Sequence, residues 1–123
     1  MKSNLQKLKD FGVMPTTIPK ALKTKWLKAL RSGNYMQGRS YLYDSFTNRY
    51  CCLGVLVKCA TNETPPLFKS LPSYNFCKQY NIGNINPIVF HNGNLNPLSY
   101  LNDGEKLSFK QIANIIEKQI IGV

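Results

Sequence analysis

The stretch "RYCCLGVLVKC", Arg49–Cys59, is the least polar run of a lysine-rich chain and holds three of its four cysteines. Its apolar centre, Cys51–Val57, is too short for hydrophobic periodicity to distinguish a helix from a buried strand. The two valines favour a strand, whereas on a helix Cys52 and Cys59, seven residues apart, would share one face. Gly54 indicates close backbone packing in either case. The residues alone therefore leave helix or strand open here.

The cysteines decide whether this run is a reactive site or part of the core. Their spacings of one, seven and eighteen residues do not fit the pairs, about two to four residues apart, that are typical of zinc ligands. Free cysteine is among the most buried residue types, and apolar surroundings make a thiol inert. We therefore expect packing residues, with no metal site, no catalytic residue and no cofactor. An enzyme that pairs Cys51 or Cys52 with His91, the only histidine, or that uses Asp103, remains an alternative.

The length of 123 residues predicts a single domain, 1–123. Within it, residues 1–16 read as an N-terminal helix and linker, with Ser3 and Gln6 as a capping box, and residues 17–123 as the core domain. A hydrophobic content of 43% is typical of globular proteins. The N-terminus has no apolar run of signal-peptide length, and no segment approaches the roughly 20 apolar residues of a membrane span. We expect an intracellular, soluble protein with reduced cysteines.

Positive charge is concentrated in the first half of the chain. Residues 1–58 contain 11 Lys and Arg and 2 acidic residues, within a net charge of +10. Such an excess indicates a polyanionic partner, although a solvated face that keeps the protein soluble is the simpler interpretation. Aromatic residues lie among the charges, and aromatic rings beside arginine can stack on bases. The candidate binding face consists of Lys20, Lys23, Lys25, Lys28, Arg31, Tyr35, Arg39, Tyr41 and Arg49.

Two segments with helical periodicity are clear. The first begins at Thr17 or Ile18 and ends near Ser32 before a glycine suited to a helix C-terminus. The second begins at the capping residue Ser108 and ends at Gly122. Their apolar faces, together with the cysteine-containing run, should form the core. The expected core residues are Trp26, Leu30, Cys51, Cys52, Leu56, Phe109, Ile112 and Ile116.

Two segments between the helices have the pattern of short β-hairpins. Residues 38–51, "GRSYLYDSFTNRYC", place turn-forming residues between two aromatic, β-prone runs. Residues 88–97, "IVFHNGNLNP", contain the turn dipeptide Asn92-Gly93. Helices that flank short hairpins, without regular βαβ alternation, predict a small α+β domain with an amphipathic helix at each end.

Three segments in this order carry a family resemblance: "WLKALRSGNYMQG" (Trp26–Gly38), "YCCLGVL" (Tyr50–Leu56) and "LNDGEKLSFKQIANIIE" (Leu101–Glu117). Together they resemble a group of small proteins encoded by tailed bacteriophages and prophages. The resemblance implies a phage origin, a shared fold and a helical conformation for the cysteine-containing block, without an assigned activity. The chain departs from the group at Val57-Lys58, where relatives tend to have a cysteine and an aspartate. This departure weakens the idea of an essential thiol or acid in this block.

A phage origin implies action in the cytoplasm of an infected bacterial host. A small basic protein of this kind is expected to be a non-enzymatic host-takeover or counter-defence protein that binds an acidic host component, such as a host protein, through its basic face. The alternative is a nucleic-acid or signalling-nucleotide binder that uses Arg31, Arg39 and Arg49 with nearby tyrosines. We expect no membrane partner, because the apolar face of the basic helix is needed for the core.

Overall fold

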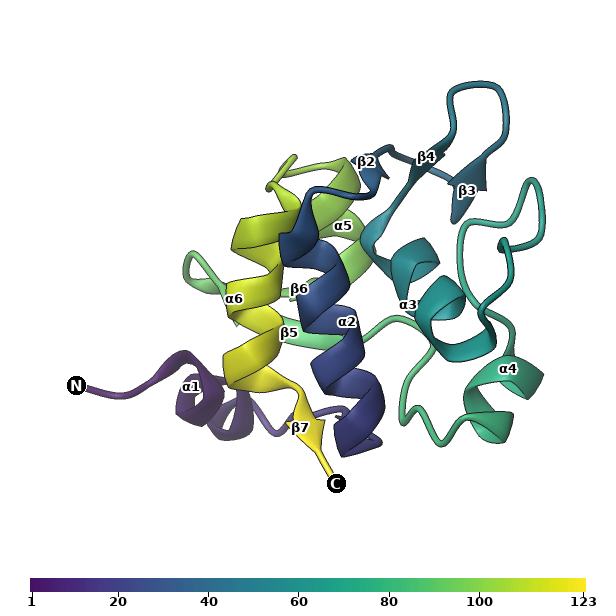
Figure 1. Ribbon diagram of the computed structural model, residues 1–123. Coiled ribbons are helices and arrows are strands. Elements are labelled where there is room, and N and C mark those ends of the chain that lie inside the picture. Colours follow the sequence, from purple (N-terminus) through teal and green to yellow (C-terminus); the bar gives the residue numbers. More distant parts are fainter.

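The computed structural model describes residues 1–123 as six helices and seven short strands (Figure 1). This arrangement confirms the predicted small α+β domain. In chain order the elements are α1 (Asn4–Asp10), β1 (Thr17–Ile18), α2 (Lys20–Ser32), β2 (Met36–Gln37), β3 (Tyr43–Asp44), β4 (Arg49–Tyr50), α3 (Cys52–Thr61), α4 (Tyr74–Gln79), β5 (Ile88–His91), β6 (Asn94–Pro97), α5 (Leu98–Asp103), α6 (Phe109–Gln119) and β7 (Ile121–Gly122).

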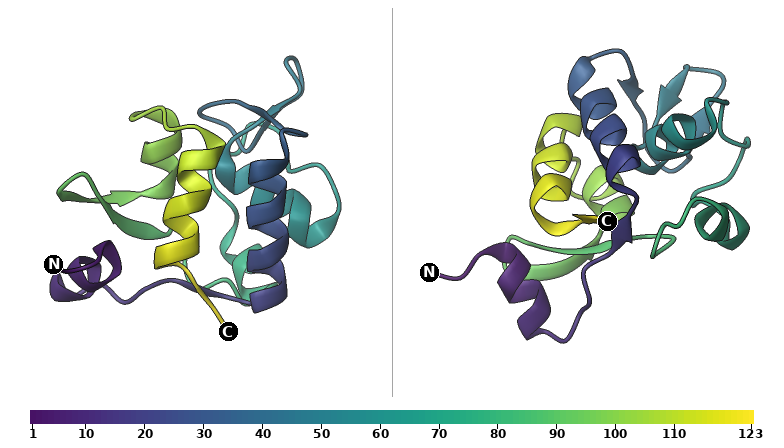
Figure 2. Two further views of the ribbon diagram at one scale, coloured as in Figure 1. Left: turned by 60° about the vertical axis from the view of Figure 1, so that its left-hand side comes forward. Right: turned by 60° about the horizontal axis from the view of Figure 1, so that its bottom comes forward.

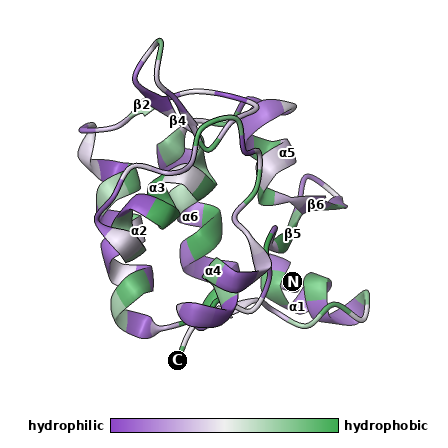
Figure 3. Cartoon of the chain, turned by 90° about the vertical axis from the view of Figure 1, so that its right-hand side faces the viewer, coloured by the Kyte–Doolittle hydropathy of each residue, from purple (hydrophilic) through white to green (hydrophobic).

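The core forms where α2, α3 and α6 pack together. Helices α2 and α6 lie side by side in both views of Figure 2, and α3 packs against the other flank of α2. Figure 3 shows hydrophobic segments of α3 and α6 at the centre of the molecule. The residues expected in the core are all buried there: Trp26, Leu30, Cys51, Cys52, Leu56, Phe109, Ile112 and Ile116.

The cysteine-containing run folds as helix α3, as the resemblance implied. Cys51 is the N-cap, and its Sγ accepts a hydrogen bond from the main-chain N–H of Gly54 at 3.4 Å. Every residue from Cys52 to Val57 is buried, so this helix has no solvent-facing stripe in its first turns. A helix buried on all sides lacks amphipathic periodicity, and this explains why the pattern alone could not distinguish it from a strand.

Two predicted helix boundaries were wrong for one reason. Thr17–Ile18 forms strand β1 instead of the first turn of α2, and α6 ends at Gln119 instead of Gly122. The two segments pair in parallel as β1 and β7, so their main-chain groups bond to each other. The N–H of Lys20 also donates to the carbonyl of Val123 at 3.0 Å. Tertiary hydrogen bonding thus replaces the helical bonds that local propensity favoured.

The other helix signals behave largely as predicted. Ser108 and Gln111 form a complete capping box at the start of α6. At α1 only half of the predicted box is present: Ser3 accepts from the N–H of Gln6, while the Gln6 side chain bonds to Asp10 instead. Helix α1 packs against β5 (Figure 2), and its Leu8 is fully buried.

Both predicted hairpins are present, but one is shorter than its pattern suggested. Strands β3 and β4 pair over only two residues each, and β2 joins them in parallel to give the order β2-β4-β3. Strands β5 and β6 pair over four residues each. Between them Asn92 and Gly93 have φ of 52° and 83°, the positive values that a two-residue hairpin turn requires. Helix α5 was not predicted, because its six residues are too few to show a helical period.

Candidate binding surface

The outer face of α2 carries uncompensated positive charge. Five of its thirteen residues are basic and none is acidic. Because Trp26 and Leu30 turn inward, Lys20, Lys25 and Lys28 are exposed, and none of these three forms an ion pair. Lys20 and Lys28 are eight residues apart in sequence, which corresponds to about 12 Å along the helix axis. The surface therefore presents three free ammonium groups on one rigid element.

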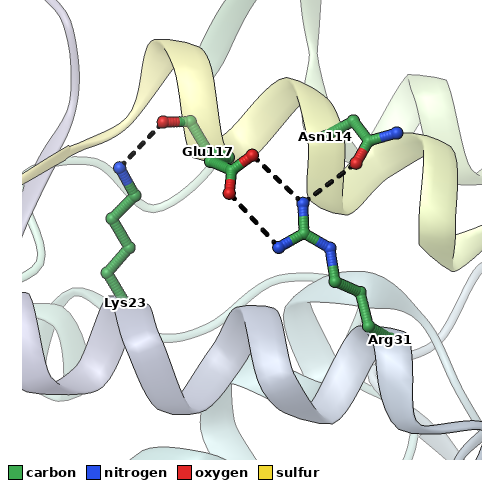
Figure 4. A network of polar contacts seen from close by, with 4 residues as sticks. All are labelled: Lys23, Arg31, Asn114 and Glu117. Carbon is green, nitrogen blue, oxygen red and sulfur yellow. Dashed lines mark hydrogen bonds and ion pairs between the residues drawn. The ribbon is translucent and has the colours of Figure 1, made fainter.

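The other two basic residues of α2 bond to α6 within the domain (Figure 4). The Arg31 guanidinium donates to Asn114 Oδ1 at 2.9 Å and to both carboxylate oxygens of Glu117, at 3.3 and 3.4 Å. Lys23 Nζ donates to the main-chain carbonyl of Glu117 at 3.0 Å, near the C-terminus of α6, where a cation suits the helix dipole. Lys23 and Arg31, both expected on the binding face, thus have intramolecular partners.

Two arginines extend the positive surface onto the β2-β4-β3 sheet, beyond the C-terminal end of α2 (Figure 1). Arg39 is exposed just after β2. Arg49 on β4 is exposed too, and its Nη1 donates to the carbonyl of Gln37 at 3.3 Å. The cations of the predicted face therefore lie in two groups, one along α2 and one at this sheet.

The two tyrosines of the predicted face have different environments. Tyr35 is half-buried, with its ring edge against Tyr50 at 5.0 Å between centroids. Burial raises the pKa of its hydroxyl. Tyr41 is exposed and packs edge-to-face on Phe68, with centroids 6.1 Å apart. Of the two, Tyr41 is therefore the one with a ring accessible to a partner, because Tyr35 contributes chiefly to packing.

All four cysteines are buried, and all four are free thiols. Burial raises the pKa of Cys51 to about 11 and holds the pKa of Cys52 well above its usual value. Burial also raises the pKa of Cys59 and Cys77. The Cys52 thiol contacts the carbonyl of Leu98 at 3.9 Å. Since the thiolate is the nucleophilic form, these surroundings favour packing over reaction.

The segment "LND" contains a polar residue that joins several elements inside the core. Asn102 on α5 is fully buried, and its Oδ1 accepts from the N–H of Cys52 at 3.2 Å and from Gln37 Nε2 at 3.0 Å. Its Nδ2 donates to the carbonyl of Gly38 at 2.9 Å and to Asp103 at 2.7 Å. Asn102 therefore ties α5 to α3 and to β2.

Sequence reasoning missed a group of exposed apolar side chains in the loop between α3 and α4 and at the first residue of α4. They are Leu67, Phe68, Leu71 and Tyr74. Phe68 lines a hollow of about 210 Å³ with Tyr41 and Phe46. Leu71 lines a neighbouring hollow of about 460 Å³ with Leu42, among other residues. The segment "PPLFKSLPSY", residues 65–74, could have indicated these exposed side chains. It places large apolar residues near prolines without the periodicity of a helix or a strand.

The fold and this surface define the class: a small α+β domain with a buried thiol-rich helix and a cationic exterior. A family model described as a domain of unknown function, DUF8296, matches residues 18–86, more than half of the chain, and the protein belongs to this family. The matched region runs from β1 past α4 and includes all nine residues of the predicted binding face. No curated protein and no solved structure matches the chain. None of the helices combines the length and the apolar character needed to cross a membrane.

Proposed function

We propose that this is a phage-encoded, non-enzymatic protein that binds an acidic component of its bacterial host and so serves host takeover or counter-defence. The contact surface is the cationic face of α2, composed of Lys20, Lys25 and Lys28, with Arg39 and Arg49 beyond its C-terminal end. The site of action is the host cytoplasm. The phage origin rests on the three sequence blocks that resemble phage and prophage proteins.

The observation that supports binding through α2 is that several of its charges oppose the stability of the helix itself. Basic residues three apart, as in Lys25 with Lys28 and Lys28 with Arg31, repel each other, and each such pair costs a few tenths of a kcal/mol. Lys20 and Lys23 lie in the first turn, where positive charge opposes the helix dipole. Folding uses only Lys23 and Arg31. A partner with negative charge would relieve the repulsion among the others.

A matched pair of charge-reversal variants tests this proposal. Lys25→Glu with Lys28→Glu reverses the α2 face, whereas Lys110→Glu with Lys118→Glu makes the same charge change on exposed positions of α6. Each tagged protein is incubated with lysate of infected bacteria, and bound components are identified with and without nuclease treatment. We expect a nuclease-resistant component that the α6 variant retains and the α2 variant loses.

Equal capture by the two variants would contradict the proposal, since binding would then not depend on α2. Loss of the captured component after nuclease treatment would instead favour the alternative, a protein that binds nucleic acid. A captured nucleotide would point to a signalling-nucleotide binder.

A further inference from the structure

Three aromatic rings converge on the surface beside the β2-β4-β3 sheet, away from the lysines of α2. Tyr41, Phe46 and Phe68, here called the aromatic platform, are 41%, 90% and 71% exposed and line one shallow hollow of about 210 Å³. Tyr41 and Phe46 belong to the segment around β3, and Phe68 to the loop between α3 and α4. Since burying an aromatic ring is strongly favourable, three rings left in solvent at one hollow suggest a surface that a ligand covers.

Two of the three rings of the platform, Tyr41 and Phe68, are positioned by contacts within the protein before any ligand binds. The N–H of Leu42 donates to the carbonyl of Lys69 at 2.8 Å, which joins the two segments directly behind the rings. Tyr41 packs edge-to-face on Phe68 with an interplanar angle of 86°. Phe68 has φ of 61°, a left-handed conformation that is unfavourable for a bulky residue. Pre-positioned rings lower the ordering cost of binding.

Cations outnumber carboxylates in the segments that carry the platform, although Asp44 is the one charged residue that lines the hollow itself. Residues 39–49 and 66–71 contribute three cations, Arg39, Arg49 and Lys69, and a single carboxylate, Asp44. Asp44 Oδ1 accepts the main-chain N–H of Phe46 at 2.9 Å, so this carboxylate shapes the turn that carries the ring. The ligand therefore has flat faces for the rings and negative charge for the cations.

We infer that the aromatic platform binds single-stranded nucleic acid, with unpaired bases stacked on Phe46 and Phe68 and the backbone phosphates near Arg39, Arg49 and Lys69. Every base has a π-face, and stacking on aromatic side chains is the common mode of single-strand binding. In a duplex the base faces are covered by their neighbours, so the platform selects unpaired bases. The three rings and Lys69 lie outside the surface proposed for the acidic host component, whereas Arg39 and Arg49 belong to both surfaces, so variants of the rings distinguish the two proposals.

Fluorescence anisotropy with three labelled probes tests the inference on the full chain. The probes are a mixed-sequence 20-nucleotide single strand, its duplex, and a strand of equal length with abasic sites throughout. We expect the single strand to bind at least tenfold more tightly than either other probe at moderate salt. Equal affinity for the abasic strand would overturn the inference, because phosphate contacts alone would then explain binding. Absence of binding to all three probes would also overturn it and would leave a protein partner as the occupant.

Single-residue variants test which side chains bind the single strand. Phe46→Ala and Phe68→Gly should each weaken single-strand binding about tenfold, while Tyr74→Ala, an equally exposed aromatic outside the hollow, should not. Glycine suits the left-handed backbone at position 68, so Phe68→Gly should keep the wild-type melting temperature. Lys69→Gln should lower the salt dependence, with a change in slope of about 0.7. If both ring variants bind as wild type while Lys25→Glu with Lys28→Glu abolishes binding, the nucleic-acid site is α2 and the inference is wrong.

Discussion

The indole Nε1 of Trp26 donates a hydrogen bond to the main-chain carbonyl of Cys52, 2.9 Å away in the core. Both residues are fully buried. This contact joins α2 to α3, because Cys52 is the first residue of α3. The helix that presents the cationic face is thereby attached to the thiol-rich helix by a polar bond as well as by apolar packing.

Truncation of Trp26 should therefore be costly. Trp26→Ala removes a large buried ring and should lower the free energy of unfolding by about 3–5 kcal/mol. Trp26→Phe retains much of the ring but not the donor, so a smaller loss of about 1–3 kcal/mol is expected. Urea unfolding monitored by circular dichroism measures both. A Trp26→Phe variant as stable as wild type would show that the bond to Cys52 contributes nothing.

Gly54 should not tolerate even a methyl group. A Cβ at this position would overlap the carbonyl oxygen of Leu42, which is rigid backbone. Gly54→Ala should therefore lower the free energy of unfolding by about 3 kcal/mol or more. Helix propensity alone predicts the opposite sign, a gain of about 0.5–1 kcal/mol. The sign of the change in the urea midpoint thus decides between close packing and ordinary helical behaviour.

Asn102 should be essential for stability, because its buried side chain joins three elements. Asn102→Ala would leave the N–H of Cys52 and the carbonyl of Gly38 without their side-chain partner, and each unsatisfied buried group costs about 1–3 kcal/mol. The expected loss is about 3 kcal/mol, measured by thermal unfolding. Ser99→Ala on the same helix provides the comparison, since it removes a single part-buried hydrogen bond, from Asn86 Nδ2 to Ser99 Oγ at 2.7 Å, and should cost less. Comparable stability of the two variants would argue against the buried network.

The buried thiols should make stability depend on pH in the alkaline range. Burial raises the pKa of Cys51 from 9.0 to about 11, so between these values the folded thiol keeps its proton while the unfolded one loses it. The contribution of the protonated Cys51 thiol to the free energy of unfolding is fully present below pH 9 and is lost as the pH rises to about 11. A shift of this size corresponds to about 3 kcal/mol. Cys51→Ala should show a shallower decline in urea midpoint over this range than wild type, and parallel curves would contradict the assignment.

Much of the fold was predictable because several signals were local. The Ser108 capping box and the Asn92-Gly93 turn specify their elements through neighbouring residues, and both are present in the structure. Strands β1 and β7 were not predictable, since each is two residues long and forms only through a partner about a hundred residues away. Local pattern carries no information about such pairing. The prediction therefore started α2 too early, at Thr17 or Ile18, and ended α6 too late, at Gly122.

The candidate surface was predictable in charge but not in detail. The sequence predicted that the basic residues lie on α2. It could not predict that Lys23 and Arg31 bond to Glu117, because that contact depends on how α6 packs against α2. The sequence could not predict that Phe68 is exposed either. Its left-handed backbone and its contact with Tyr41 arise only when two loops meet.

Reaction of the native protein with a thiol reagent such as DTNB tests most directly whether the cysteine-containing helix is sealed core rather than a working site. Cys51 and Cys52 are 4% and 0% exposed, so we predict that neither reacts faster than the whole protein unfolds, and that both react once urea unfolds the chain. Rapid labelling of either thiol at neutral pH, with an unchanged circular dichroism spectrum, would contradict the account and would favour a cysteine-dependent activity over a binding function.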